Sequence, residues 1–188
     1  QPGNLREEGT YRVNRDIQVS SGATLDFNGQ TLQMNTEEGM DNDFDVINDG
    51  ALAATGESSL EFLGRGEATV TGDVDGASNS PKTFTFPAVT VNKPDDDGDA
   101  DTEARRVLFE MDDSANDEAD GFEFEGDFTI TAAQNWSSSD DDGVEFESEV
   151  TGGNGSTTPT DKVVDVVRVN GSFDQQGGSV LAFDNHAG

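Results

Sequence analysis

The chain has 188 residues, of which 40 are Asp or Glu and 10 are Lys or Arg, so its formal net charge is −30 at neutral pH. Such an excess of negative charge argues against polyanionic nucleic acid as a partner. The absence of Cys excludes disulfides and cysteine nucleophiles, and the single histidine, His186, leaves zinc and haem sites without a ligand set.

From Thr10 to Met34 apolar residues recur mostly at every second position, which predicts strands with one buried face. Turns at Ser21-Gly22 and Asn28-Gly29 interrupt these strands, because glycine adopts positive φ without steric cost. The same order of strand, Gly, short strand, Gly and strand returns over 46–64 and 167–183. Units of roughly twenty residues are typical of stacked rungs.

The three copies align through glycines and apolar residues. Gly22-Ala23-Thr24-Leu25 matches Gly50-Ala51-Leu52, Gly29 matches Gly56, Leu32 matches Leu60, and Gly171 precedes Phe173 in the third copy. Further strands are predicted at 69–74, 83–91, 106–111, 122–132 and 144–150. The chain is read as one β domain over 1–188, with acidic loops at 94–104, 112–121 and 137–143 and a flexible linker at 152–161 before the last repeat.

This repeat resembles the right-handed parallel β-helix of secreted and surface proteins, which implies an all-β solenoid. An antiparallel β-sandwich or jelly roll is the alternative, because Asn28-Gly29, Asp49-Gly50 and Asn170-Gly171 are also strong hairpin signals. The recurrent glycine register favours the solenoid.

Lysine is scarce, with Lys82, Lys93 and Lys162 the only three. The composition resembles that of proteins from extremely halophilic archaea, in which hydrated carboxylates and cations cover the surface. This resemblance implies folding in concentrated salt, where the Debye length falls to about 3 Å at 1 M. A partly disordered acidic chain is the competing interpretation.

The first residue is Gln1, and no apolar stretch approaches the roughly 20 residues of a membrane span, so we expect no membrane span, a removed signal peptide and an extracellular or cell-surface location. Three sequons, at Asn135, Asn154 and Asn170, are candidate glycosylation sites. Chance occurrence in a chain rich in Ser, Thr and Gly is the alternative.

Alternating carboxylates at Asp95, Asp97, Asp99 and Asp101 form a candidate calcium site, since Ca²⁺ prefers oxygen ligands. The run departs from the EF-hand and looks more like the acidic runs of extracellular calcium repeats. A hydrated acidic loop is the alternative, as it is for Asp140-Asp141-Asp142. No cofactor is required by this interpretation.

No enzyme is predicted. The chain has no G-x-S-x-G sequence, and although many β-helix proteins are polysaccharide lyases or glycosidases, only Trp136 and Tyr11 could stack sugars.

The favoured function is a structural subunit of an extracellular filament or cell-surface layer, which binds copies of itself head to tail. The N-terminal segment carrying Tyr11, Val13, Ile17 and Val19 is the candidate assembly element, by donor-strand exchange. This logic resembles that of several pili of bacteria and archaea. The alternatives are a carbohydrate-binding adhesin or polysaccharide-acting module, with surface glycans as partners, and a virion structural protein of a halophile virus.

Overall fold

The computed structural model describes residues 3–4, 9–36, 41–47, 50–54, 56–73, 83–93, 106–112, 121–131, 143–149, 166–176 and 181–184. All the regular elements in these ranges are β-strands. None of the described residues belongs to a helix that could cross a membrane.

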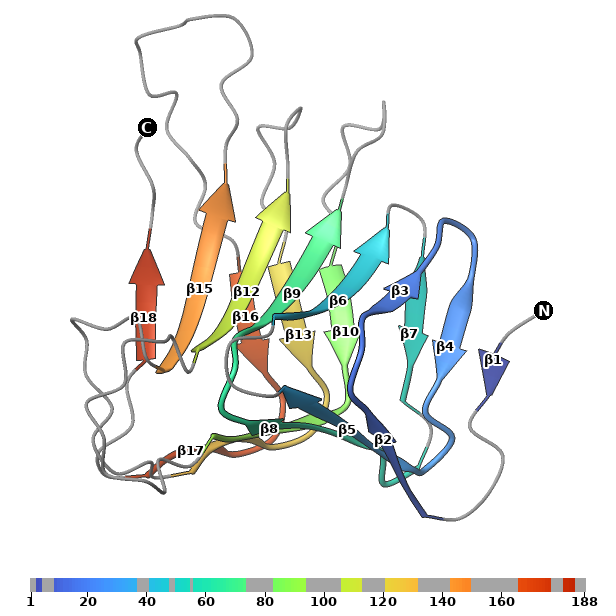
Figure 1. The fold of residues 1–188 in the computed structure, drawn as a ribbon, viewed down its shortest axis with the longest axis horizontal. Coiled ribbons are helices and arrows are strands. Elements are labelled where there is room, and N and C mark those ends of the chain that lie inside the picture. Colours follow the sequence, from blue (N-terminus) through green and yellow to red (C-terminus); the bar gives the residue numbers. More distant parts are fainter. Residues whose placement is uncertain are drawn as a thin grey trace, which may run out of the picture.

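The strands form six rungs that follow one another along the chain (Figure 1). Their bounds, rung by rung, are β1 Gly3–Asn4, β2 Thr10–Val13 and β3 Ile17–Val19; β4 Thr24–Asp26, β5 Thr31–Thr36 and β6 Asn42–Ile47; β7 Ala51–Ala53, β8 Ser59–Gly64 and β9 Ala68–Asp73; β10 Thr83–Phe86, β11 Ala88–Asn92 and β12 Arg106–Asp112; β13 Gly121–Phe124, β14 Phe128–Ile130 and β15 Gly143–Glu149; and β16 Val166–Val169, β17 Phe173–Gln175 and β18 Leu181–Asp184.

Each strand pairs in parallel with the strand three places before or after it, which is the topology of a parallel β-helix. The first face consists of two sheets, β1-β4-β7 and β10-β13-β16. The second face is β2-β5-β8-β11-β14-β17, and the third is β3-β6-β9-β12-β15-β18. The predicted β-helix is therefore confirmed, and the antiparallel sandwich is excluded for these residues.

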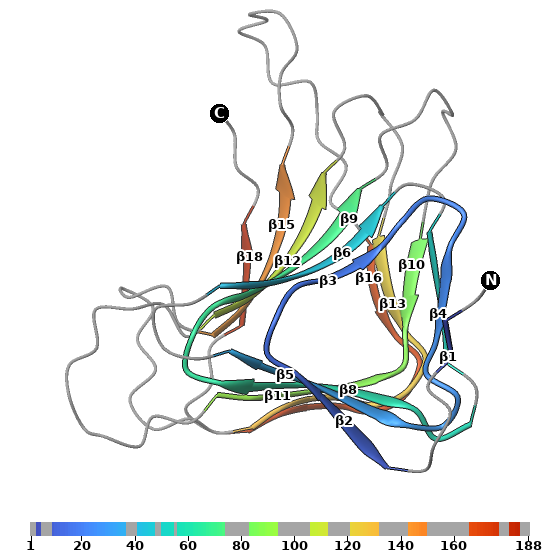
Figure 2. The same cartoon turned by 45° about the vertical axis from the view of Figure 1, so that its right-hand side comes forward.

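The three faces surround a common interior (Figure 2). The burial pattern along the strands shows that every second side chain points into this interior. Phenylalanine dominates this core: Phe109 packs against Phe62, Phe86, Phe122, Phe124, Phe128 and Phe146. The ring centroids of Phe109 and Phe146, on neighbouring rungs, lie 4.9 Å apart in a stacked arrangement. Such aromatic pairs add about 0.5–1.5 kcal/mol each beyond the area they bury.

The corner between the first and second faces is short in every rung. At most five residues separate the strands there, whereas up to 13 separate the second from the third face, and up to 16 the third from the first. Asn28 and Gly29 lie at this short corner with φ of 50° and 74°. The Asn-Gly signal is therefore used to turn between faces and not to close a hairpin.

The same corner explains two errors in the predicted strands. The expected strand 122–132 is divided into β13 and β14, and the expected strand 83–91 is divided at Pro87 into β10 and β11. The inward alternation of Phe122, Phe124, Phe128 and Ile130 continues through the corner, so the sequence pattern alone reads as one strand.

The aligned repeats are confirmed in the first two copies and shifted in the third. Leu25 pairs with Leu52, and Leu32 pairs with Leu60. Gly171, however, lies over Gly126 at the corner between the first and second faces, as Gly56 lies over Gly29. Gly171 therefore occupies the corner of Gly29 and Gly56, one corner later along the chain than the corner of Gly22 and Gly50 that the sequence pattern indicated.

The repeat length also differs from the expected twenty residues. Equivalent residues of the second face are Tyr11, Leu32, Leu60, Val89, Phe128 and Phe173, so their spacing grows from 21 to 45 residues. Most of this increase in spacing comes from longer connections at the two longer corners. Because the spacing is not constant, a search for a fixed repeat length does not detect the later rungs.

Gly64 ends β8 at the corner between the second and third faces and has φ of +87°. A Cβ atom placed there would lie 2.0 Å from the carbonyl oxygen of Thr36, its neighbour on the rung before. That oxygen accepts hydrogen bonds from the backbone N–H groups of Arg65 and Gly66 at 2.9 and 3.3 Å. The close approach of backbone to backbone therefore requires glycine at this corner.

We predict that Gly64→Ala lowers the free energy of unfolding by about 2–4 kcal/mol, because positive φ and overpacking both penalise the added methyl group. Gly22→Ala is the matched control, since Gly22 also has positive φ (71°) but nothing within 4 Å of the added atom. It should cost only about 1–2 kcal/mol. Denaturant unfolding in molar salt measures both variants, and equal losses would contradict the role of the Thr36 contact.

Candidate assembly surfaces and buried charges

The N-terminal rung presents one end of the β-helix. Tyr11 and Val13 lie on β2 and pair with Leu32 and Met34, so their side chains belong to the inward ladders of the second face. Ile17 and Val19 occupy the corresponding inward positions of β3. The four predicted assembly residues therefore pack against the core of their own chain, at the N-terminal end of the β-helix. Within the described residues, β2 and β3 have no strand on their outer edge.

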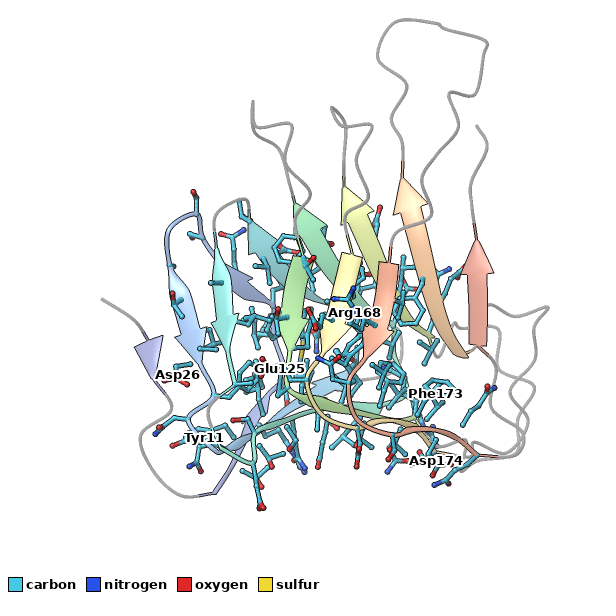
Figure 3. All side chains as sticks on the ribbon, turned by 180° about the vertical axis from the view of Figure 1, so that it is seen from behind. Tyr11, Asp26, Glu125, Arg168, Phe173 and Asp174 are labelled. Carbon is cyan, nitrogen blue, oxygen red and sulfur yellow. The ribbon has the colours of Figure 1, made fainter. Side chains whose placement is uncertain are left out.

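The C-terminal rung presents the opposite end, where β16, β17 and β18 are the last strands of their sheets within the described ranges. Phe173 on β17 is 49% exposed, and it is the one exposed large apolar residue among those whose side chains the structure describes. Its ring stacks on that of Phe128, with centroids 5.9 Å apart. Figure 3 shows Tyr11 at one end of the β-helix and Phe173 and Asp174 at the other.

The two ends carry almost none of the net charge. Residues 1–16 contain three arginines and three acidic residues, and residues 166–188 contain one arginine and two aspartates. Their net charges are therefore zero and −1, so residues 17–165 supply −29 of the total of −30. Contact between the two ends would therefore bring together segments that have almost no net charge.

Carboxylates crowd the outer surface of the third face near β3 and β6. The backbone N–H of Asp43 donates to Oδ1 of Asp16 at 3.4 Å. Burial, followed by the charges of Asp16 and Asp41, raises the pKa of Asp43. Burial and the charges of Asp43 and Asp16 also raise the pKa of Asp45, against hydrogen bonds that lower it. Repulsion of this kind is screened by concentrated salt.

Farther along the same face, a cation lies between carboxylates that are two rungs apart. The Arg106 guanidinium lies 2.9 Å from Glu67 and 3.1 Å from Glu145. Partial burial alone would lower the pKa of Arg106, but the two carboxylates raise it above its ordinary value. This bridge links three rungs of the third face through one side chain.

Lys93 follows β11 and is fully buried, unlike most lysines in folded proteins. Its Nζ donates a hydrogen bond to the carbonyl oxygen of Gly66 at 2.5 Å. Burial lowers the pKa of Lys93 to about 7, although the charge of Glu67 opposes this shift. Lys93 and Arg106, which flank the acidic segment 94–105, therefore both interact with Glu67.

The structure places only some of the predicted site residues. Asn170 is exposed after β16, and its Nδ2 donates to Oε1 of Glu123 at 2.8 Å. The other predicted glycosylation sites, Asn135 and Asn154, lie outside the described residues, as do the candidate calcium ligands Asp95, Asp97, Asp99 and Asp101. Among the residues that are described, no group of three or more His, Asp or Glu could hold a metal ion.

Sequence reasoning missed three features of these surfaces: the exposed ring of Phe173, the buried ammonium of Lys93 and the neutral ends. The last could have been found by summing charge along the chain. Comparison with protein-family models, curated proteins and solved structures gave no match.

We predict that the free energy of unfolding rises as the pH increases from about 7 toward 10. The pKa of Lys93 is lower in the folded chain than the ordinary 10.5, so in this window the unfolded state binds more protons, and raising the pH favours folding. Few other groups titrate here, because the chain has three lysines, one tyrosine and no cysteine.

Lys93→Met should abolish most of this rise, and Lys162→Met is the control for loss of one positive charge. Denaturant titrations at constant high salt over this pH range measure the effect. An unchanged pH profile in Lys93→Met would show that the buried ammonium is not the source.

Proposed function

We propose that the protein is a structural subunit that assembles head to tail into an extracellular filament or cell-surface layer in concentrated salt. The observation that carries the proposal is the pair of nearly neutral rung ends, at residues 1–16 and 166–188, in a chain whose net charge is −30. Strand edges without a neighbour pair readily with other chains unless they are blocked. Exposed Phe173 adds an apolar contact at the C-terminal end.

The geometry of such a contact favours an open polymer. The N-terminal and C-terminal rungs are different surfaces, so contact between them is heterologous and produces a filament whenever the rotation does not close a ring. Adding a subunit then continues the stacking of rungs that holds each subunit together, at the strand spacing of about 4.8 Å.

The strand pairing favours docking of complete rungs over exchange of the N-terminal strand. β2 and β3, which span the predicted donor segment, pair with β5 and β6 of the same chain. β2 and β3 would therefore dock on the next subunit while they remain paired within their own chain. The same contact could serve the coat of a virus that infects a halophile.

Salt is needed because the lateral faces of the subunits are acidic. Subunits in a row would bring their acidic faces close together, and the resulting repulsion is long-ranged in dilute buffer. At about 1 M salt the Debye length of about 3 Å leaves mainly the short-range end contacts.

We predict that the protein forms polymers above about 1 M salt and dissociates on dilution. Phe173→Asp should weaken association by roughly tenfold or more, because it places an unpaired charge in the contact. Asn92→Asp is the matched control, since it adds the same charge at an exposed position on the side of the β-helix and should leave assembly unchanged.

Sedimentation velocity and negative-stain imaging across a salt series make this measurement. A monomer at every salt concentration would refute the structural function. Measurable glycan binding by that monomer would instead favour the carbohydrate-binding adhesin.

A further inference from the structure

Two ladders of side chains run along the second face through all six rungs. The inward ladder is Tyr11, Leu32, Leu60, Val89, Phe128 and Phe173, and the outward ladder is Arg12, Gln33, Glu61, Thr90, Thr129 and Asp174. The last members of each ladder complement the first: an aromatic ring ends the inward ladder at both ends of the molecule, and a cation and an anion end the outward ladder.

Within the chain, neighbouring members of these ladders already form hydrogen bonds and stacked ring pairs from one rung to the next. Arg12 donates from Nε and Nη2 to Oε1 of Gln33 at 3.4 and 3.1 Å, and Nε2 of Gln33 donates to Oε2 of Glu61 at 2.7 Å. On the inward side, the rings of Phe128 and Phe173 are stacked. Side chains one rung apart on the second face are therefore within bonding reach.

We infer that the C-terminal rung binds the N-terminal rung of a second copy in the register that continues both ladders, with Asp174 beside Arg12 and Phe173 against Tyr11 of the next copy. This inference rests on the proposed head-to-tail function and specifies its contact. Figure 3 shows that Tyr11 lies on the same side of the β-helix as Phe173 and Asp174, as a continuous face requires.

The chemistry of Arg12 suits this position. A guanidinium has five N–H donors, of which Gln33 accepts two, so a carboxylate on the other side of Arg12 would find donors in the plane of the group. Asp174 and Phe173 are both exposed on β17, the last strand of the second face, so the contact would pair the charge and cover the ring.

A register shifted by one residue is less favourable. A shift of one residue would turn the β17 side chains onto the wrong faces of the ladders, so that Asp174 would lie beside an inward position such as Tyr11 or Val13. An unpaired carboxylate would then be buried in the core of the junction, at a cost of several kcal/mol. The in-register junction avoids this cost, so it should be the one observed.

Cysteine pairs test the register directly, because the chain has no cysteine of its own. Neighbouring parallel strands place paired Cα atoms about 4.8 Å apart, within the range of a disulfide. A chain carrying both Arg12→Cys and Asp174→Cys should, after assembly in salt and oxidation, give a ladder of covalent oligomers that a reductant collapses. The pair Arg12→Cys and Gln175→Cys, which places the second sulfur on the opposite face of the strand, is the register control and should cross-link at least tenfold less.

A charge exchange tests the ion pair without a covalent bond. Arg12→Glu alone and Asp174→Arg alone each create a like-charged junction, so each should raise the concentration needed for assembly about tenfold at the lowest salt that supports wild-type polymers. An equimolar mixture should recover wild-type assembly, because alternating copies then form only oppositely charged junctions. Far-UV circular dichroism of each variant verifies that its fold is intact.

The outcomes separate this inference from the proposed function. If wild-type polymers form but the control pair cross-links better, or if the mixture assembles no better than either single variant, the register is wrong and head-to-tail assembly stands. If wild-type chains remain monomeric in all salt concentrations, both are overturned.

Discussion

Parallel, in-register stacking is the constraint on which the rest of this structure depends. Each residue lies directly over its equivalent on the next rung. A charged residue is therefore about 4.8 Å from the equivalent residues of the rungs before and after it. Acidic residues pair in register at some positions of the third face, as Glu110 does with Glu147, whereas at other positions a different side chain separates the carboxylates. Arg106 between Glu67 and Glu145 is one such separation, and Gln33 joins the cation of Arg12 to the anion of Glu61.

The same rule divides the molecule into surfaces with different tasks. Inward positions stack apolar side chains on apolar side chains, which builds a phenylalanine core despite a hydrophobic content of only 31%. The lateral surface holds the charge, and near Asp43 burial, followed by the charges of Asp16 and Asp41, raises the pKa of that carboxyl group. The ends carry almost no net charge, and for that reason we propose them as the surfaces of self-association.

The sequence predicted the fold class because alternation and glycine both report local backbone geometry. Asn28-Gly29 was recognised as a turn, but whether a turn joins antiparallel neighbours or two faces of a solenoid depends on contacts with residues 21 and 28 positions away, such as Tyr11 and Leu60 beside Leu32. The sequence pattern places the third repeat one corner too early, because connections of unequal length remove the common period. Arg12 and Asp174 could not be associated before the register of all six rungs was known, since 161 residues separate them.

The unequal corners also determine where this architecture can change. The short corner between the first and second faces fixes the direction of the chain in every rung, whereas connections of 13 and 16 residues at the other two corners leave the paired strands in register. Because the entropy of closing a loop grows only slowly with its length, grafted peptides at these two corners should cost little stability. The β-helix is thus a ready scaffold for displaying foreign sequences in rows along two of its edges.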